Sequence, residues 1–386
     1  MTIERGPGER PLVSAILTTY GRPDLLHEAL DSVYAQDGQG KIFDLEAVVV
    51  DDASPNDARA IVARYPALYV RHPENRGVAA ALNTGIAATR GVYVAFLDDD
   101  DVWLPGKLRA QVPVLEAHPD VGAVYGGSRA RPHWTGPSGR IFEELLTWNF
   151  VGYFTVLARR TALARVGYLD ETLRSNEDYD LWLRLAYHFP FTFVPGATGI
   201  YRPSPQGLFQ SKIATGASRH LLRRVIDKAL AMAPELSDET AQRIRMQMER
   251  KNFADLLLLP PEAALSQMLA HLRECPAIAE DPVVCRGFAR VIRLQALASG
   301  SAVESARRIC ATLQENAGQG RARRLLAAVW AELALGLLSA GRGLTAISAG
   351  STALRHDPGT VVQRGLGWVR RMTRGPRAPV EESTAR

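Results

Sequence analysis

Apolar runs and amphipathic segments alternate along the first 120 residues of the chain. Runs that are apolar at nearly every position predict buried strands. The segments between them carry apolar residues at helical spacing, as at Leu26, Leu30 and Val33, and predict helices. The expected strands are residues 12–20, 45–52, 68–73 and 91–100, and the expected helices are residues 22–36, 56–65 and 77–90.

Strands and helices in this order indicate a parallel sheet that is covered on both faces. Right-handed crossovers then build a doubly wound α/β architecture of the nucleotide-binding type. Ligands of such sheets bind at the carboxyl ends of the strands. Three expected strands end in polar residues that should meet in one site: Thr18, Thr19 and Tyr20, then Asp51 and Asp52, then Asp98, Asp99 and Asp100.

The pattern of the chain changes after its first half. It is mixed from about 140 to 205, and after about 215 it is almost purely helical and rich in Ala, Leu and Arg. We therefore expect an α/β domain at 1–214 and an all-α C-terminal domain at 215–386.

Four consecutive aspartates, Asp98 to Asp101, follow the last of these strands. Like charges this close raise each other's pKa values, so a cation is expected to compensate them. Side chains of an extended segment alternate, which places Asp98 and Asp100 on one side. Two carboxylates at a strand end suit Mg²⁺ or Mn²⁺ that shares its ligand shell with substrate phosphates. A solvated acidic turn is the alternative.

Two further acidic clusters have comparable alternatives. Asp51 and Asp52 could accept hydrogen bonds from a base or ribose, or could form a turn and cap the next helix. Glu177 and Asp178 begin an amphipathic helix, where a carboxylate could take a proton from an attacking hydroxyl or could simply suit the helix dipole. Trp182 on that helix could face a sugar ring or could belong to the core.

Four motifs in order resemble the inverting nucleotide-sugar glycosyltransferases of family 2. They span about residues 12–202 and read "VSAILTTYGRPDLLHEALDSVYAQ", "VVVDDASPNDA", "ENRGVAAALNTGIAATRGVYVAFLDDDDVWLPGKL" and "VLARRTALARVGYLDETLRSNEDYDLWLRLA". The resemblance implies a GT-A nucleotide-diphospho-sugar transferase fold, which has a Rossmann-like mixed sheet. It also implies transfer of a sugar from a nucleotide diphosphate, typically UDP, to an acceptor hydroxyl. The transfer is a metal-assisted single displacement that inverts the anomeric configuration.

The resemblance also implies site residues, with Asp100 as direct ligand of Mn²⁺ or Mg²⁺, Asp98 beside it and Asp178 as catalytic base. The implied donor-binding residues are Thr18, Tyr20, Asp51, Asp52, Arg76, Asn83, Asp98 and Asp99. Trp182, Glu177 and Trp148 are candidates for acceptor binding. Relatives often have a metal-reaching histidine where this chain has Ser204, so the third metal ligand is open.

The composition, 46% hydrophobic and 23% charged, is that of a soluble globular protein. Neither a membrane-spanning run nor a signal peptide is evident, so we expect a cytoplasmic protein. The net charge of +5 is carried by the last 46 residues, which argues against general nucleic-acid binding. Residues 361–377 resemble a basic amphipathic helix, which could contact an anionic membrane or pack on its own domain.

The acceptor expected from the resemblance is a glycan or lipid-linked glycan, in assembly of a cell-surface polysaccharide or glycoconjugate. Two other functions are weighed against this one. A nucleotidyltransferase would need a Gly-rich phosphate loop, of which "TTYGRPDLL" is a poor version. A catalytically inactive sugar-nucleotide-binding or scaffold protein would not need Asp100 and Asp178.

Overall fold

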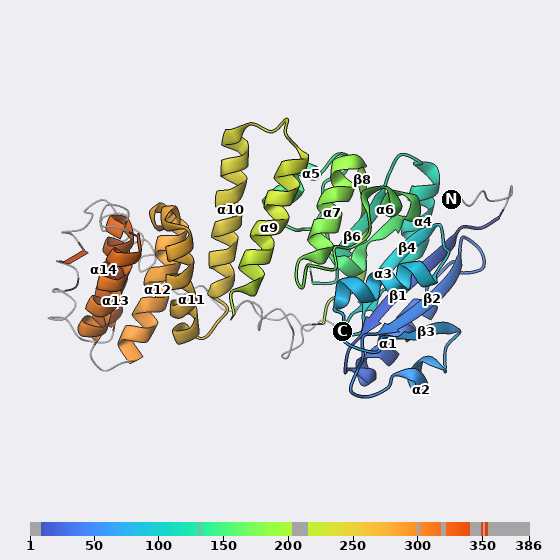
Figure 1. The fold of residues 1–386 in the computed structure, drawn as a ribbon, viewed down its shortest axis with the longest axis horizontal. Helices are drawn as coiled ribbons and strands as arrows, with labels where there is room; N and C mark the ends of the chain where they lie inside the picture. The colour runs from blue at the N-terminus through green and yellow to red at the C-terminus, as the bar shows by residue number, and fades with distance from the viewer. Residues whose placement is uncertain are drawn as a thin grey trace, which may run out of the picture. The chain divides into compact units, whose positions relative to one another are not determined.

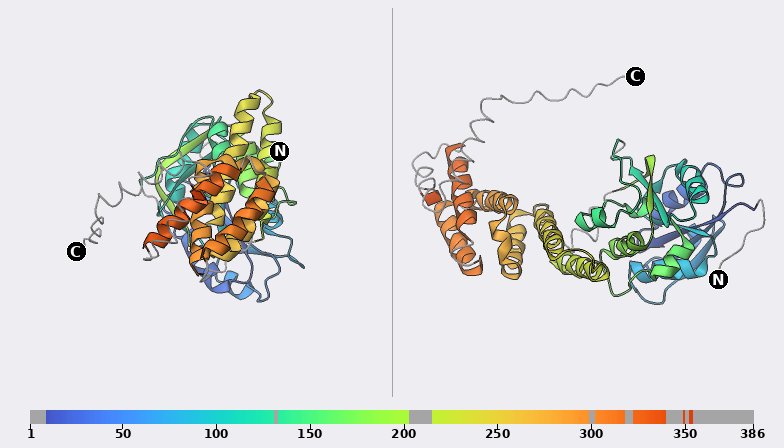
Figure 2. Two further views of the ribbon diagram at one scale, coloured as in Figure 1. Left: turned by 90° about the vertical axis from the view of Figure 1, so that its left-hand side faces the viewer. Right: turned by 90° about the horizontal axis from the view of Figure 1, so that it is seen from above.

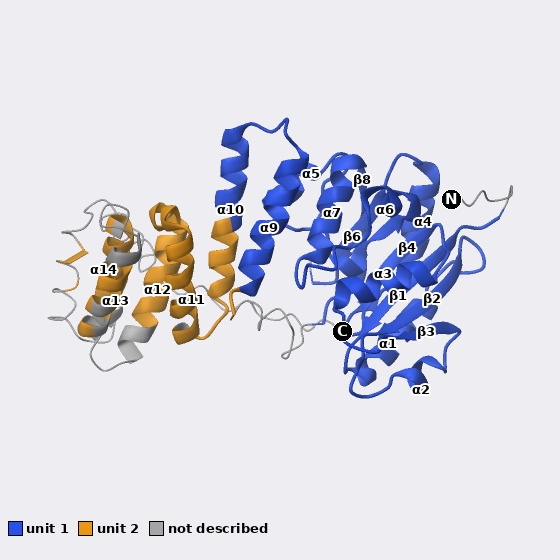
Figure 3. Cartoon of the chain, in the orientation of Figure 1, with its two compact units in different colours: residues 1–209, 217–248 blue, residues 210–216, 249–386 orange. Residues whose placement is uncertain are grey.

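The computed structural model describes residues 9–130, 133–202, 215–298, 302–317 and 322–339, together with Ala349, Thr352 and Ala353 (Figure 1). Ser204 and the predicted basic helix at 361–377 lie outside these described residues. The chain divides into two compact units, residues 1–209 with 217–248 and residues 210–216 with 249–386 (Figure 3).

The first unit contains an eight-stranded sheet in the order β3-β2-β1-β4-β7-β6-β8-β5. The strands β3, β2, β1 and β4 are parallel, as the sequence predicts, whereas β7 runs antiparallel to both β4 and β6. The sheet is therefore mixed, which confirms the expected fold class. The strands are β1 Leu12–Thr19, β2 Asp44–Asp51, β3 Ala67–Arg71, β4 Tyr93–Asp98, β5 Val102–Trp103, β6 Ala123–Ser128, β7 Leu157–Arg159 and β8 Phe191–Ile200.

Helices cover this sheet on both faces, because alternate residues of each strand point to opposite sides. In β1, Leu17 joins a core cluster with the helices α1 and α4, while Ile16 joins another with α3 and α7. The helices of the unit are α1 Pro23–Tyr34, α2 Arg59–Val62, α3 Val78–Ala88, α4 Lys107–Ala117, α5 Phe142–Thr147, α6 Arg160–Val166, α7 Glu177–His188 and α9 Ala217–Met232, with the 3₁₀ helix η1 Tyr153–Thr155.

Helix α9 belongs to the first unit, although the sequence predicts a boundary at 214. Its apolar residues join the core cluster of α7, and Lys228 Nζ lies 2.8 Å from the buried carboxylate of Asp180. The first part of α10 (Asp238–Leu256) returns beside α9 (Figures 1 and 2). The units therefore divide after Met248. An amphipathic helix does not reveal in sequence which surface it covers.

The second unit is helical, as expected. It holds the end of α10 and the helices α11 Pro261–Glu274, α12 Pro282–Ala298, α13 Ala302–Ala317 and α14 Ala322–Ser339, with the 3₁₀ helix η2 Pro276–Glu280. Its core includes Phe253, Met268, Phe288 and Trp330. Among the described helices of both units, none combines the length and apolarity of a membrane span.

Candidate active site

The polar ends of three parallel strands lie side by side at one edge of the sheet. In the strand register, Thr18 of β1 is opposite Asp98 of β4, and Thr19 is opposite Asp51 of β2. The Thr18 hydroxyl donates a hydrogen bond of 3.1 Å to Asp98. The structure thus brings together the polar residues that were expected to form a site at the carboxyl ends of these strands.

The four aspartates form a turn rather than an extension of β4. The Asp101 amide donates to the Asp98 carbonyl at 3.1 Å, which returns the chain on itself. One carboxylate oxygen each of Asp98, Asp100 and Asp101 therefore lie within 4.8 Å of one another. Alternation along a strand pointed to the first two, but it did not select Asp101. We call Asp98, Asp100 and Asp101 the acidic cluster.

The acidic cluster fits a divalent cation in its donor chemistry. Its hard carboxylate oxygens are those preferred by Mg²⁺ and Mn²⁺. Burial raises the pKa of Asp98 well above its ordinary value, and the charges of the neighbouring aspartates add to this. Burial also raises the pKa of Asp101 to about 7, against the opposing hydrogen bond from the Arg202 amide. Negative charge crowded in this way is what a bound cation would relieve.

Asp99 points away from the acidic cluster. It is fully buried, and its Oδ2 accepts the Thr19 hydroxyl at 2.7 Å. Its Oδ1 lies 2.6 Å from the guanidinium of Arg22. These partners leave Asp99 on the protein side of the turn, so the structure does not place it at a donor sugar. Tyr20, expected at the base and ribose, follows β1 with 51% of its surface exposed.

Asp51 is bound by strand β3 and by the loop that follows β2. It accepts hydrogen bonds from the Tyr69 hydroxyl at 2.6 Å, from Arg71 at 3.1 Å and from the Ser54 amide at 2.7 Å. Burial raises the pKa of Asp51, but the hydrogen bonds from the Tyr69 hydroxyl and the Ser54 amide outweigh it, so the pKa lies below its ordinary value. No part of this carboxylate is exposed. Of the two sequence alternatives, the structure shows the turn.

Asp52 fixes the entry to helix α3. Its carboxylate accepts the backbone amides of Arg76 at 2.9 Å and Gly77 at 2.7 Å, and it contacts His72 Nδ1 at 2.7 Å. Unpaired amides at a helix start need such an acceptor. Gly77 has a φ of +89°, a backbone conformation that L side chains rarely adopt, which favours glycine at this position. Asp52 is 5% exposed, and it binds the amides just before α3 rather than those of the helix that directly follows it.

Asn83 and Arg76 contact a loop after α6 rather than each other. The Asn83 side chain donates to the Leu169 carbonyl and accepts the Leu169 amide, both at 3.0 Å. Arg76 lies 3.1 Å from Glu171 and is half exposed. The side-chain amide of Asn83 therefore ties α3 to this loop, and its predicted contact with the donor stays a prediction.

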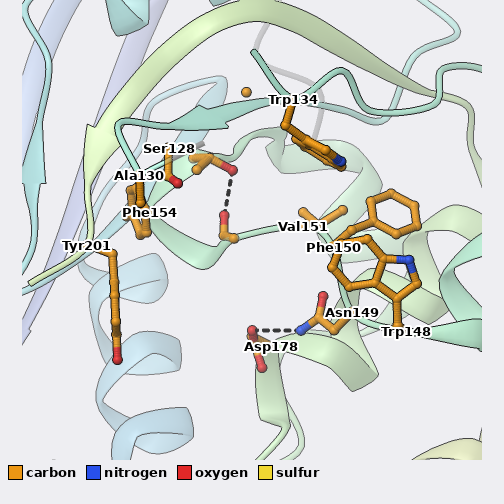
Figure 4. Close-up of a pocket in the computed structure, with 13 residues that line it drawn as sticks. Ser128, Ala130, Trp134, Trp148, Asn149, Phe150, Val151, Phe154, Asp178 and Tyr201 are labelled. Carbon is orange, nitrogen blue, oxygen red and sulfur yellow. Dashed lines mark hydrogen bonds between the residues drawn. The ribbon is translucent and has the colours of Figure 1, made fainter. Parts of the chain in front are cut away.

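A second part of the site is a cavity of about 420 Å³ beside the start of α7 (Figure 4). Asp178 in the first turn of α7 lines it, together with Trp148, which is 41% exposed. The side-chain amide of Asn149 donates to Asp178 Oδ2 at 3.3 Å. The cavity is lined by Gly126, Ser128, Ala130, Trp134, Trp148, Asn149, Phe150, Val151, Gly152, Phe154, Thr155, Asp178 and Tyr201.

Trp182 and Glu177, two acceptor candidates from the sequence, are not in this lining. The Trp182 side chain is fully buried, with its ring 6.0 Å from Phe96 and 6.4 Å from Tyr153. Its assignment to a sugar-binding face is therefore wrong, and the core alternative holds. Helical periodicity places Trp182 on the buried face of α7, which favoured the core but did not exclude the site.

Asn149 and Tyr201 line the cavity although the sequence did not single them out. Asn149 lies in an irregular segment, where no periodicity indicates orientation. Tyr201 directly follows β8 and is 56% exposed. Position at the end of a core strand was a usable signal for it, since that rule found the other strand-end residues.

A mixed sheet with an acidic turn at its carboxyl edge, and a cavity lined by Asp178, is the arrangement expected of the GT-A fold. Residues 14–172 match the model of Glycosyl transferase family 2, so this part of the chain is a glycosyltransferase domain of that family. This confirms the family inferred from the four motifs.

Three relatives illustrate this family membership. An uncharacterized glycosyltransferase from Methanocaldococcus jannaschii is 26% identical, with 54% of this chain and 76% of that protein covered. One from Haemophilus influenzae is 28% identical, with coverage of 47% and 64%. The Bacillus subtilis protein TuaG, named for teichuronic acid biosynthesis, is 28% identical, with coverage of 46% and 72%.

Two solved structures share the fold. Mannosyltransferase PcManGT from Pyrobaculum calidifontis, in complex with GDP-Man and Mn²⁺, has a TM-score of 0.50 at 23% identity, with 82% of this chain and 87% of that chain covered. S. aureus TarS 1–349, in complex with UDP-GlcNAc, has a TM-score of 0.52 at 15% identity, with coverage of 89% and 91%.

Proposed function

We propose that this glycosyltransferase moves a sugar from a nucleotide-diphosphate donor to an acceptor hydroxyl by one inverting displacement. The observation that carries the proposal is the closeness of the acidic cluster to the Asp178 cavity. The pKa of the Tyr153 hydroxyl is raised well above its ordinary value by burial and by the charges of Asp98, Glu177 and Asp178. The Tyr153 side chain therefore lies near both the acidic turn and the start of α7.

Tyr201 gives a second link between the two parts. It lines the Asp178 cavity, and the amide of the next residue, Arg202, donates to Asp101 Oδ1 at 3.1 Å. A donor diphosphate at the acidic cluster and an acceptor in the cavity would thus be neighbours. Such proximity is the first requirement of a displacement between two bound substrates.

The roles of the protein groups follow from this arrangement. Asp178 accepts the proton of the acceptor hydroxyl as its oxygen forms a bond to the anomeric carbon. The bond from that carbon to the diphosphate oxygen breaks, and the nucleoside diphosphate leaves with the electron pair. Asn149 holds the Asp178 carboxylate in place. A divalent cation held by Asp98, Asp100 and Asp101 would supply positive charge to the leaving diphosphate.

The solved neighbours support a sugar nucleotide as donor, since they are complexes with GDP-Man, UDP-GlcNAc or UDP. We favour a UDP-sugar. The name of TuaG supports a role in polysaccharide assembly, and we expect a glycan or lipid-linked glycan acceptor. Aromatic rings in the cavity wall, among them Trp134 and Trp148, suit the apolar face of a sugar ring.

The test is a panel of UDP- and GDP-sugars with Mn²⁺, Mg²⁺ or EDTA, followed by thermal melting and by release of nucleoside diphosphate. Metal-dependent stabilisation and slow release support the proposal. Release of pyrophosphate from a nucleoside triphosphate would instead indicate a nucleotidyltransferase. Binding without release under every condition would indicate an inactive sugar-nucleotide-binding protein. For an acceptor that is turned over, NMR of the product's anomeric proton tests inversion.

A further inference from the structure

Arg22 places its guanidinium between two neighbouring aspartates of the acidic turn. One of its terminal nitrogens lies 2.6 Å from Asp99 Oδ1, and the other contacts Asp100 Oδ2. Asp100 belongs to the acidic cluster, whereas Asp99 does not. A positive charge from the start of α1 therefore already engages one of the three carboxylates that would hold a cation.

The two arms of Arg22 are held very differently. Asp99 is fully buried and is fixed from its other side by the Thr19 hydroxyl. A buried carboxylate needs its cation, because an unpaired charge there is costly. The Asp100 side chain is 18% exposed. The arm on Asp99 is thus the anchor, and the arm on Asp100 is the one that another cation can replace.

The backbone of Arg22 does not need to move for this exchange. Its carbonyl accepts the amides of Leu25 at 3.2 Å and Leu26 at 3.3 Å, which fixes it at the start of α1. The side chain, however, is 36% exposed. Rotation about its terminal bonds can free one arm while the other keeps its contact with Asp99.

We propose that Arg22 is a built-in cation that competes with a divalent metal for Asp100 and, once displaced, donates to an oxygen of the donor diphosphate. The inference rests on the proposed function. Metal binding alone leaves one arm of Arg22 without an acceptor, and an arriving diphosphate provides one. Metal and nucleotide therefore bind cooperatively, and the coupling acts equally in both directions.

The proposal also reassigns Asp99. Its position in the acidic run suggested a contact with the donor, but its oxygens hold Arg22 and Thr19. It acts as the positioning group for Arg22. The sequence signal for this pairing is weak, because Arg22 and Asp99 are 77 residues apart and meet only when β1 and β4 pair.

The experiment measures binding rather than turnover, with full-length protein and isothermal titration calorimetry. Mn²⁺ is titrated with and without UDP or GDP, and the nucleotide is titrated at saturating Mn²⁺. Arg22→Gln is expected to bind Mn²⁺ alone roughly tenfold more tightly and the nucleotide roughly tenfold more weakly, the size of one charge-assisted hydrogen bond. The factor by which Mn²⁺ raises the affinity for the nucleotide should fall towards one.

Two further variants complete the test. Arg22→Lys keeps a charge for Asp99 but cannot bridge two carboxylates, so it should also bind Mn²⁺ alone more tightly than wild type. This variant keeps the test valid if Arg22→Gln folds poorly. Arg10→Gln removes an arginine from the exposed pair with Asp44 at the other end of β1 and should behave as wild type. Unchanged Mn²⁺ affinity and unchanged coupling in both Arg22 variants would overturn the inference about Arg22 but leave the proposed function standing. Wild-type protein that binds neither Mn²⁺ nor nucleotide would overturn the proposed function with it.

Discussion

Asp178→Asn is the most direct perturbation of the proposed mechanism, because it removes the proton acceptor without changing the shape of the side chain. Asp178 is partly exposed, and its contact with Asn149 is long, at 3.3 Å. An asparagine oxygen can still accept that hydrogen bond. The residue also lies in the first turn of α7, where loss of a negative charge costs about 0.3–1 kcal/mol. The variant should therefore fold.

The effect on catalysis should be far larger than the effect on stability. A positioned general base contributes about 10²–10⁴-fold, which corresponds to about 2.7–5.4 kcal/mol of the barrier. A loss of 1 kcal/mol in stability lowers the melting temperature by only about 2–4 °C for a domain of this size. We thus expect kcat to fall at least a hundredfold while the affinity for UDP changes by less than about twofold.

The assay is transfer from the donor selected by the panel, with nucleotide affinity measured on the same preparation. Asp120→Asn, at an exposed position between α4 and β6, is the matched control. If Asp178→Asn kept more than a tenth of the wild-type kcat, Asp178 would not be the base. If it lost UDP binding as well, the residue would belong to the donor site instead.

Three other outcomes follow from the structure. Asn149→Ala should lower kcat about tenfold with unchanged nucleotide affinity, since it only orients the base; a change in nucleotide affinity alone would contradict this. Asp180→Ala should cost about 3–5 kcal/mol in urea unfolding, because Asp180 is 2% exposed and pairs with Arg184 and Lys228, each at 2.8 Å. A loss under about 1 kcal/mol would refute the pairing. Because burial raises the pKa of Asp101 to about 7, Mn²⁺ affinity should rise from about pH 5 to 8, and Asp101→Asn should flatten that rise.

The same shift sets the pH dependence of stability in the metal-free protein. Asp101 has a pKa of about 7 in the folded protein and an ordinary pKa of 3.8, so its protonated form favours the folded state. This contribution is complete below pH 3.8 and is lost as the pH rises through 7. The melting temperatures of wild type and Asp101→Asn, measured between these pH limits, should therefore converge at low pH and diverge near neutrality.

Local patterning was sufficient for the elements and for the edge of the sheet where the site lies. Buried strands are apolar throughout, so the four parallel strands could be read directly, and polar residues at their ends marked the site. The predicted helix at 56–65 shortened to Arg59–Val62, because local signals fix the ends of an element less well than its existence. Alternation pointed to Asp98 and Asp100, but their closeness comes from the turn in which the Asp101 amide donates to the Asp98 carbonyl.

The direction in which each site residue points depended on contacts between distant segments. Asp99 turns inward because Thr19 and Arg22 lie there, and Asn83 is occupied because the loop at Leu169 packs against α3. Trp148 and Trp182 are chemically alike, yet one lines the cavity and the other fills the core. Sequence periodicity records only whether a position alternates towards a core. Which neighbours bury it, and whether its hydrogen bonds are already satisfied, is decided when β1, β4 and α7 come together.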